Sequence, residues 1–397
     1  MKNNPLSISM LQMYGLAMFY FTANSVLTVI FPLQASEHGM REEEIGIMMG
    51  MYMFVCMILR PWAGQMVAKY SVMTIMKWLL VGHTLALLLY VLMGVESLYA
   101  VRILQGVVTA FFSMAMQIGI SEVLRDEDRG QGMAMYSLST VLPSLYGPAL
   151  ALALWIQGDM KWLLLFITVL AFLPLLFFIK SPLPKTRKPN ASFTMREMLG
   201  AMKESRKQSG LMKSAVVMLI GAAIFGALSA FLPLFLVTEN IGNAALYLFV
   251  QAFVVVGSRF VFRKYIPSDG RWHPKFIALV LMSSVIGTGL LASFPAVLAF
   301  LYVSAVFNGI TMAMLYPTLT TYISFAVPND QRHILLGVFL ASYDFGFSMG
   351  GFLMGFIVQF FSYEAMFVAC SLLGVIAVIY NFYPAKKSVE MKQISMN

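Results

Sequence analysis

Long apolar stretches alternate with short polar connections along almost all of the 397 residues of this chain. A helix needs about 20 apolar residues to cross the hydrocarbon core of a bilayer, at about 1.5 Å per residue. The pattern predicts twelve such helices, at residues 10–33, 45–68, 73–94, 98–124, 132–156, 162–179, 214–237, 244–261, 276–294, 296–325, 334–360 and 365–382. The predicted fold class is therefore an all-α integral membrane protein with twelve transmembrane helices.

The helices fall into two sets of six on either side of a basic segment, and several residues recur between the sets. Arg60 and Arg259 each close an apolar run and lie 199 positions apart. Matches that recur at an offset of 203 are Gln105-Gly106 with Asn308-Gly309, Arg129 with Arg332, and Gly147 with Gly350. A nearly constant offset close to half the chain length is typical of internal repeats. We expect two pseudo-symmetric six-helix bundles, residues 1–180 and 214–397, joined by a cytoplasmic basic linker at residues 181–213.

Composition agrees with this class and sets the expected orientation. The chain is 59% hydrophobic and 11% charged, with a mean hydropathy of +0.79, values that exclude an ordinary soluble domain. Lysine and arginine collect in alternate connections, in the central segment and at both termini. Because such residues stay on the cytoplasmic side of a membrane, we expect a multi-pass protein of the cytoplasmic membrane with both termini inside. The net charge of +9 is then a topology signal and no indication of nucleic-acid binding.

Four charged residues stand out well inside predicted spans, namely Arg60, Arg102, Arg259 and Asp344. Each costs about 3 kcal/mol near the centre of a bilayer, so it needs a structural or functional reason. Three cations against one anion favour a carboxylate-bearing solute, because guanidinium groups bind carboxylates through two hydrogen bonds. The alternative is structural: Arg60 and Arg259 would serve helix ends near the cytoplasmic surface, and Asp344 would be the fixed partner of a neighbouring polar group.

Polar residues at helical spacing accompany these charges and predict a shared polar interior. We expect Arg60 and Arg102 to bind anionic substrate groups, and Asn24, Gln105 and Gln117 to orient the substrate. Asp344, the one acidic residue well within a span, is the predicted proton carrier. The spans at 73–94, 162–179 and 365–382 are almost uniformly apolar and are expected to face lipid.

The sequence lacks the residue patterns that metal binding, nucleotide binding or catalysis would require. Neither histidine nor cysteine is spaced with acidic residues as a metal site requires, and no phosphate-binding loop is present. No span carries a nucleophile beside a histidine, so we expect neither an enzyme nor a cofactor. Without a nucleotide site, the energy for transport is expected to come from a proton gradient. A membrane sensor is the remaining class, but the short termini offer it no output domain.

Two motifs resemble those of the major facilitator superfamily. LYAVRILQG, with Arg102, Gln105 and Gly106, resembles the fourth-helix motif of that family, and PSLYGPALAL, with Gly147 and Pro148, resembles its fifth-helix antiporter motif. The resemblance implies the family fold, alternating access and export. It also implies conformational roles for Gly106, Gly147 and Pro148. We expect a conformational role for Arg259 too, because it is the repeat equivalent of Arg60. The loop GQMVAKYSVMTIMK departs from the family pattern, because Ala68 stands where an aspartate is usual.

A closer resemblance is carried by four segments, RPWAGQ, RILQGVVTAFFSM, RKYIPSDGRWHPK and YPTLTTYISF. They are similar to exporters of opine-type metallophores such as staphylopine. This implies a small anionic or zwitterionic substrate with several carboxylates, amines and an imidazole. The expected function is proton-coupled export of such a carboxylate-rich metallophore by a monomer, with protons and the lipid bilayer as further partners. The alternative is a broad-specificity drug/proton antiporter, for which the aromatic-rich spans would suffice.

Overall fold

A computed structural model describes residues 4–125, 128–156, 160–179, 209–267, 269–293, 297–326 and 332–383 of the chain. Within these ranges the chain is almost wholly helical. The α-helices are α1 (Ile8–Glu37), α2 (Glu42–Lys69), α3 (Val72–Met93), α4 (Leu98–Val123), α5 (Arg129–Ile156), α6 (Met160–Phe178), α8 (Ser209–Thr238), α9 (Ala244–Val261), α10 (Pro274–Ser293), α11 (Leu298–Ala326), α12 (Arg332–Phe360) and α13 (Tyr363–Phe382). Two short 3₁₀ helices, η1 (Gly94–Ser97) and η2 (Phe262–Tyr265), follow α3 and α9. The predicted all-α fold class is confirmed.

Hydropathy separates the helices into two groups. Eight apolar segments of the described chain, one of which includes both α3 and α4, are long and apolar enough to cross a membrane by length and composition. The helices outside that set are α2, α9 and α12, and they carry Arg60, Arg259 and Asp344. The membrane-spanning character predicted from the sequence is therefore confirmed. The fourth charge, Arg102, lies on α4, inside one of the eight segments.

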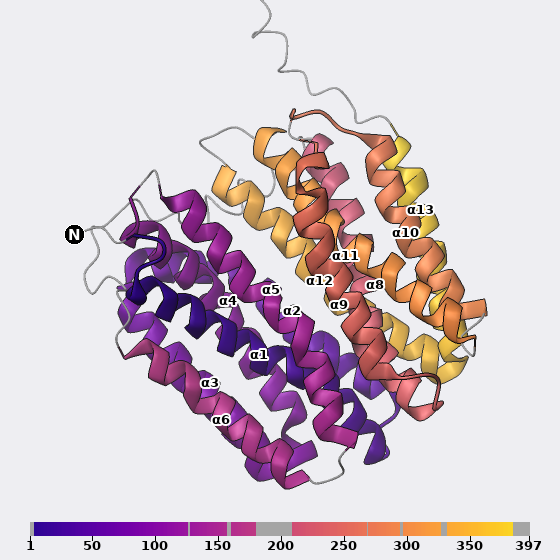
Figure 1. Cartoon of the computed structure of the whole chain (residues 1–397), viewed down its shortest axis with the longest axis horizontal. Helices are drawn as coiled ribbons and strands as arrows, with labels where there is room; N and C mark the ends of the chain where they lie inside the picture. The colour runs from indigo at the N-terminus through magenta and orange to yellow at the C-terminus, as the bar shows by residue number, and fades with distance from the viewer. Residues whose placement is uncertain are drawn as a thin grey trace, which may run out of the picture.

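Helices α1 to α6 lie on one side of the molecule and α8 to α13 on the other (Figure 1). Residues 181–208 of the predicted linker lie outside the described ranges, and α8 begins at Ser209, inside the last part of the segment predicted to be linker. The two sides meet mainly where α2 packs along α12 and α5 packs along α9. These pairs place Arg60 beside α12 and Arg259 on a helix that packs against α5.

One glycine contact recurs in both halves. A Cβ atom on Gly106 of α4 would lie 2.5 Å from the carbonyl oxygen of Tyr52 on α2. A Cβ atom on Gly309 of α11 would lie 2.8 Å from the carbonyl oxygen of Gln251 on α9. Tyr52 and Gln251 are 199 positions apart, as Arg60 and Arg259 are. The repeated sequence pattern thus corresponds to a repeated helix contact that only a residue without a side chain permits.

The interface between α2 and α12 is built on small residues. A Cβ atom on Gly50 would lie 2.6 Å from the carbonyl oxygen of Ser348, and one on Gly351 would lie 3.1 Å from that of Gly46. Small residues let helix backbones approach closely, which is how helices associate in lipid without a hydrophobic driving force. Closely packed glycines therefore join the two halves between the start of α2 and the end of α12.

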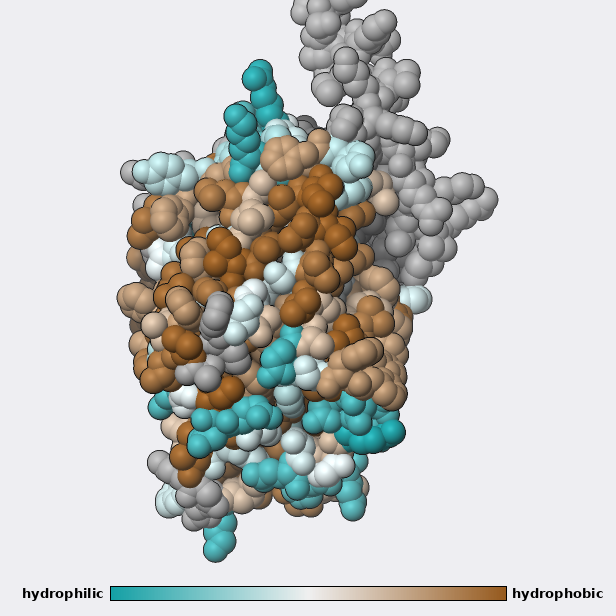
Figure 2. Space-filling view, turned by 90° about the vertical axis from the view of Figure 1, so that its right-hand side faces the viewer, coloured by the Kyte–Doolittle hydropathy of each residue, from teal (hydrophilic) through white to brown (hydrophobic). Residues whose placement is uncertain are grey.

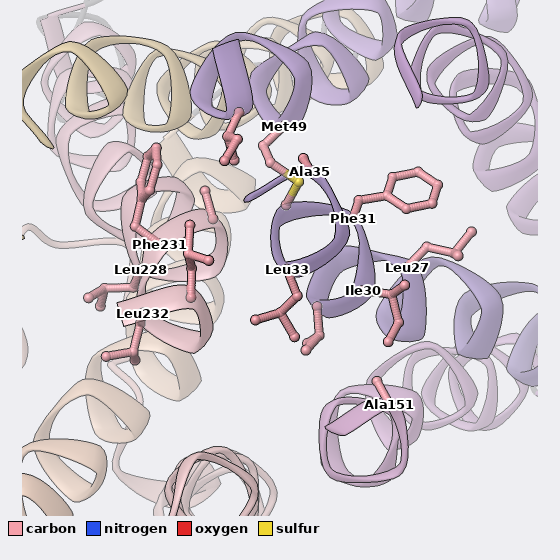
Figure 3. Packing of buried hydrophobic residues seen from close by; sticks show 14 of the residues in the cluster. Leu27, Ile30, Phe31, Leu33, Ala35, Met49, Ala151, Leu228, Phe231 and Leu232 are labelled. Carbon is pink, nitrogen blue, oxygen red and sulfur yellow. The ribbon is translucent and has the colours of Figure 1, made fainter. Parts of the chain in front are cut away.

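Buried apolar side chains form three clusters whose positions differ along the bundle. We call the end where α1 begins and α13 ends the terminal end, and the other the opposite end. At the opposite end one cluster includes Leu33 of α1, Met49 of α2 and Phe231 of α8, so it joins both halves (Figure 3). Toward the terminal end each half has its own cluster, around Met76 in one and Leu281 in the other. The halves therefore share one cluster at the opposite end, whereas at the terminal end each has its own, with Val141 of α5 packed against the cluster around Leu281.

The helices expected to face lipid carry large exposed apolar side chains. Trp78 and Leu92 on α3, Leu176 on α6 and Leu372 on α13 are all at least 58% exposed. On the face shown in Figure 2, apolar residues form a broad band and hydrophilic residues gather toward the ends. Such a band suits a hydrocarbon environment, where exposed apolar surface carries no cost.

Candidate functional site

Arg60 on α2 and Asp344 on α12 form an ion pair across the boundary between the halves. The Arg60 Nε atom donates to Asp344 Oδ2, and Arg60 Nη2 donates to Asp344 Oδ1 at 3.0 Å. The side chain of Asp344 is fully buried and that of Arg60 is 17% exposed. A two-point guanidinium–carboxylate pair is both strong and geometrically specific. Two residues that the sequence suggested for separate tasks, substrate binding and proton coupling, are thus direct partners.

Three tyrosines from both halves surround this pair. Tyr136 of α5, Tyr316 of α11 and Tyr343 of α12 each lie within electrostatic reach of Arg60. The rings of Tyr316 and Tyr343 pack edge to face with centroids 5.9 Å apart. Phenol rings of this kind offer both an apolar face and a hydroxyl that can donate or accept a hydrogen bond. The ion pair is therefore bordered by groups suited to holding a small polar solute.

Arg259 lies close to the same tyrosines but has no carboxylate of its own. It sits in the last turn of α9, within electrostatic reach of Tyr316 and Tyr343. Its Nε atom is buried and has no hydrogen-bond partner among the described residues. In the described part of the chain no salt bridge includes it. Among the described residues, the Nε–H group of Arg259 therefore has no hydrogen-bond acceptor.

Arg102 lies deep in the half formed by α1 to α6, at 1% exposure. Its guanidinium donates to Gln105 Oε1 at 3.4 Å and to the carbonyl oxygen of Leu27 at 3.3 Å, and it lies 2.8 Å from Met49 Sδ. Its Cζ atom is 4.7 Å from the centroid of the Phe31 ring, which suits a cation–π contact. Within the described ranges Arg102 forms no ion pair, and its Nε lacks a partner.

Asn24 and Gln105 join Arg102 in one buried polar chain. Gln105 Nε2 donates to Asn24 Oδ1 at 3.1 Å, and Asn24 Nδ2 has no partner in the described structure. One turn further along α4, Thr109 receives a hydrogen bond of 3.1 Å from the hydroxyl of Tyr52. Arg102, Gln105 and Thr109 share one face of α4 because residues three, four and seven apart align on a helix. The polar stripe predicted on this helix thus makes inter-helix contacts.

The remaining predicted residues lie elsewhere. Gln117 is only half-buried on α4, three turns beyond Gln105, and makes no hydrogen bond among the described residues. Gly147 packs α5 against α1, where an added Cβ would lie 2.5 Å from Ser25 Oγ. Pro148 follows it inside α5. Gly147 is thus a close-packing position, and the structure does not bring Gln117 to the Asn24–Gln105 pair.

Arg60, Asp344 and Arg259 lie near the same tyrosines, whereas Arg102 lies apart from them, among Phe31 and Met49 of the apolar cluster shared by both halves. All four charges were predicted site residues, whereas Tyr136, Tyr316 and Tyr343 were not. One signal was available, because Tyr343 directly precedes Asp344 and all three tyrosines belong to polar stripes of predicted spans. Within the described residues no group of three His, Cys, Asp or Glu side chains could hold a metal ion. The arrangement can bind carboxylate groups and can protonate one buried acid, Asp344.

Comparisons with known proteins agree with this architecture. The family described as Major Facilitator Superfamily matches residues 13–292 and again residues 270–395. The Staphylopine export protein of Staphylococcus aureus is 38% identical over 379 residues, which cover 94% of this chain and 95% of that protein. Uncharacterized MFS-type transporters of Burkholderia mallei and Burkholderia pseudomallei are 24% identical over 159 residues, or 40% of this chain and 38% of each of theirs.

Two solved structures share the fold. A mutant of the nucleoside transporter NupG superimposes with a TM-score of 0.76 at 15% identity, covering 94% of this chain and 98% of that one. A bacterial homologue of the human lysosomal transporter Spinster, in an inward-facing and unoccupied conformation, gives a TM-score of 0.72 at 14% identity, covering 94% and 95%. At such low identity the likeness concerns the fold alone.

Proposed function

This chain belongs to the Major Facilitator Superfamily, and from that premise we propose that it exports an opine-type, carboxylate-rich metallophore resembling staphylopine in exchange for protons. The family and the Staphylococcus aureus relative make it a multi-pass membrane transporter and not an enzyme. The choice of substrate rests on the relative's name together with the charges of the site.

The single observation that carries the proposal is the excess of buried guanidinium over carboxylate. Arg60 is neutralised by Asp344, whereas Arg102 and Arg259 have no acidic partner within the described chain. Burying an unpaired charge costs several kcal/mol unless a partner arrives. A solute with several carboxylates supplies that partner. A lipophilic cation, the usual substrate of a drug exporter, would be repelled by the same groups.

Transport by alternating access is supported by the distribution of the apolar clusters. The positive-inside rule places the terminal end of the bundle in the cytoplasm. In that orientation the shared cluster around Leu33, Met49 and Phe231 closes the outer side, while the separate cores around Met76 and Leu281 leave the halves free to part on the inner side. We propose that substrate loads from the cytoplasm in this state and leaves after the halves rock about the site.

Proton coupling follows from competition between substrate and proton for Asp344. A substrate loaded from the cytoplasm pairs a carboxylate with Arg60 and an ammonium group with the ionised Asp344; outside, a proton taken up by Asp344 removes the partner of that ammonium group and the substrate leaves. The protonated site turns back to the cytoplasm, where Asp344 loses the proton as the Arg60–Asp344 pair re-forms and the next substrate binds. In this scheme Asp344 is the proton carrier, as expected from the sequence.

The test compares a deletion strain, the same strain with the gene restored, and one carrying an Arg60→Ala copy, all grown under metal starvation. Spent medium and cell extract are analysed by mass spectrometry. We expect a chelator with several carboxylates outside only when the intact gene is present, and inside the cells without it. If no such compound moves while resistance to lipophilic cations changes with the gene, a drug exporter replaces this proposal.

A further inference from the structure

The two halves present equivalent arginines to the site, yet only one of them has an acidic partner. Arg60 on α2 and Arg259 on α9 are 199 positions apart, and both helices pack against the other half, α2 along α12 and α9 along α5. If the halves were fully symmetric, α5 would offer Arg259 a carboxylate as α12 offers Asp344 to Arg60. The difference between the halves therefore lies on α5.

Val141 stands where that carboxylate would be. It precedes Asp344 by 203 positions, the offset that also relates Gly147 of α5 to Gly350 of α12. Val141 packs against the apolar cluster that includes Val255 of α9, so this part of α5 faces the half that carries Arg259. A valine cannot neutralise a cation or accept a hydrogen bond. Arg60 thus has an acidic partner on α12, whereas the equivalent position on α5 offers no acidic partner to Arg259.

The position of Arg259 in its helix accounts for its charge but leaves its hydrogen-bonding capacity unexplained. A cation in the last turn of a helix is favoured by the helix dipole. The dipole does not satisfy the Nε hydrogen, which is buried and has no acceptor in the part of the chain that the structure describes. Unsatisfied buried donors are rare in proteins, and one explanation is a ligand that is not yet bound. Tyr316 and Tyr343 lie within electrostatic reach of both Arg259 and Arg60.

From these observations we propose that Arg259, Tyr316 and Tyr343 form a second carboxylate subsite, so that one substrate spans both halves by placing one carboxylate at Arg60 and another at Arg259. The proposal rests on the proposed function and adds a selection rule to it: a substrate with two carboxylates is preferred over the same molecule with one. Because Arg60 and Arg259 belong to different halves, such a substrate also holds the halves in a fixed relation while bound.

The experiment measures binding to the purified protein in lipid nanodiscs by isothermal titration calorimetry. The probes are an N-(1-carboxyethyl) amino acid with two carboxylates and its two monoamides, in which either carboxylate is converted to a neutral amide. Wild type is expected to bind the diacid about tenfold more tightly than either monoamide, the size of one charge-assisted hydrogen bond. In Arg259→Gln we expect the diacid to bind no more tightly than the monoamide whose neutral amide replaces the carboxylate at Arg259. The affinity of that monoamide should equal its wild-type value, and the preference for the diacid over the other monoamide should remain.

Two further variants separate a lost subsite from a damaged fold. Arg271→Gln removes an exposed arginine from the loop before α10 and should leave both preferences intact. Val141→Asp adds the carboxylate that α5 lacks and should weaken diacid binding as Arg259→Gln does. Val141→Asn, of the same size but uncharged, should weaken it much less.

The possible outcomes differ in what they overturn. If Arg259→Gln keeps the full wild-type preference for the diacid over both monoamides, the second subsite is wrong and the proposed function stands. The same holds if wild type binds the diacid and the monoamides equally. If wild type binds none of the three probes, the proposed substrate class itself is contradicted.

Discussion

Arg60 and Asp344, 284 positions apart in the chain, meet in a two-point ion pair that links the two halves of the bundle. The pair lies along the α2–α12 interface, beyond the closely packed glycines Gly46 and Gly50 and toward the terminal end. It therefore lies between the apolar cluster that both halves share and the clusters that belong to one half each. A pair in that place can respond to a substrate and to the relative position of the halves.

Removing both partners of this pair should cost less than the sum of the two single removals. Arg60→Ala leaves a buried carboxylate and Asp344→Ala leaves a guanidinium without its acceptor, so each should lower the free energy of unfolding by about 3–5 kcal/mol. The double variant leaves neither charge behind and should be less destabilised than the sum of the two. The measurement is a double-mutant cycle on thermal unfolding in nanodiscs. Strictly additive losses would show that the pair is not coupled in the membrane.

Asp344→Asn should separate exchange from proton-driven transport. The amide still accepts a hydrogen bond from Arg60 but carries no charge and takes no proton in the working range. In proteoliposomes we expect substrate exchange across the membrane in the absence of a gradient to continue, and accumulation driven by a pH gradient to disappear. A variant that accumulates substrate at the wild-type rate and still responds to the gradient would remove Asp344 from the coupling scheme.

Gly50→Ala should push α2 away from α12. An added Cβ would lie 2.6 Å from the carbonyl oxygen of Ser348, a backbone atom that cannot move aside without shifting the helix. Overpacking of this kind costs about 1–3 kcal/mol. Gly257→Ala on α9 is the matched control, because its added Cβ would meet nothing within 4 Å.

The readout is the distance between spin labels on α2 and α12 near the opposite end. Gly50→Ala should broaden that distance distribution toward longer values and slow transport, whereas Gly257→Ala should leave both unchanged. If the two variants behave alike, the close approach of α2 to Ser348 is not what holds the halves together.

Arg102→Met should separate a functional role from a structural one. The buried guanidinium has no acidic partner in the described chain, and replacing a buried charge by an apolar side chain of similar volume is often neutral or stabilising by about 1–4 kcal/mol. We therefore expect unchanged or higher thermal stability together with a large loss of transport. Parallel loss of stability and transport would indicate that Arg102 serves the fold, through Gln105 and the carbonyl group of Leu27.

The loop before α10 should respond to acid. Its Asp269 accepts a hydrogen bond from the His273 ring at 2.8 Å, and this bond lowers the pKa of the Asp269 carboxyl below its ordinary value. A lowered pKa means that the ionised acid stabilises the loop at neutral pH and that this contribution is lost as the pH falls through the folded pKa. The fluorescence of Trp272, with the other four tryptophans of the chain replaced, should change over that acidic range. In Asp269→Asn the change should be absent.

Much of the fold could be predicted because hydropathy reports directly on helices that must cross a bilayer. Each predicted span overlaps one helix of the described structure, since a backbone in lipid has to satisfy its own hydrogen bonds. The offset of 199 positions also predicted a real equivalence, seen in the contacts of Gly106 with Tyr52 and of Gly309 with Gln251. Regular periodic features of the sequence therefore carried this part of the prediction.

The pairing of charges could not be predicted in the same way. Arg60 and Asp344 lie on helices that are distant in sequence, and hydropathy does not report which helices of two bundles become neighbours. The tyrosines around the pair were visible only as members of polar stripes, because the rotation of each helix about its axis depends on its packing. Gln117 shares its helix with Gln105 but lies three turns away, about 18 Å along the axis, so it cannot reach the contact between Gln105 and Asn24.

The most direct test of the central claim uses inside-out membrane vesicles from cells that produce the protein, energised by a proton gradient that is acidic inside. The account predicts that vesicles with wild-type protein accumulate an isotopically labelled opine-type metallophore with several carboxylates, and that collapsing the gradient stops it. Vesicles without the protein should not accumulate it. Accumulation of a lipophilic cation in place of the metallophore would contradict the account.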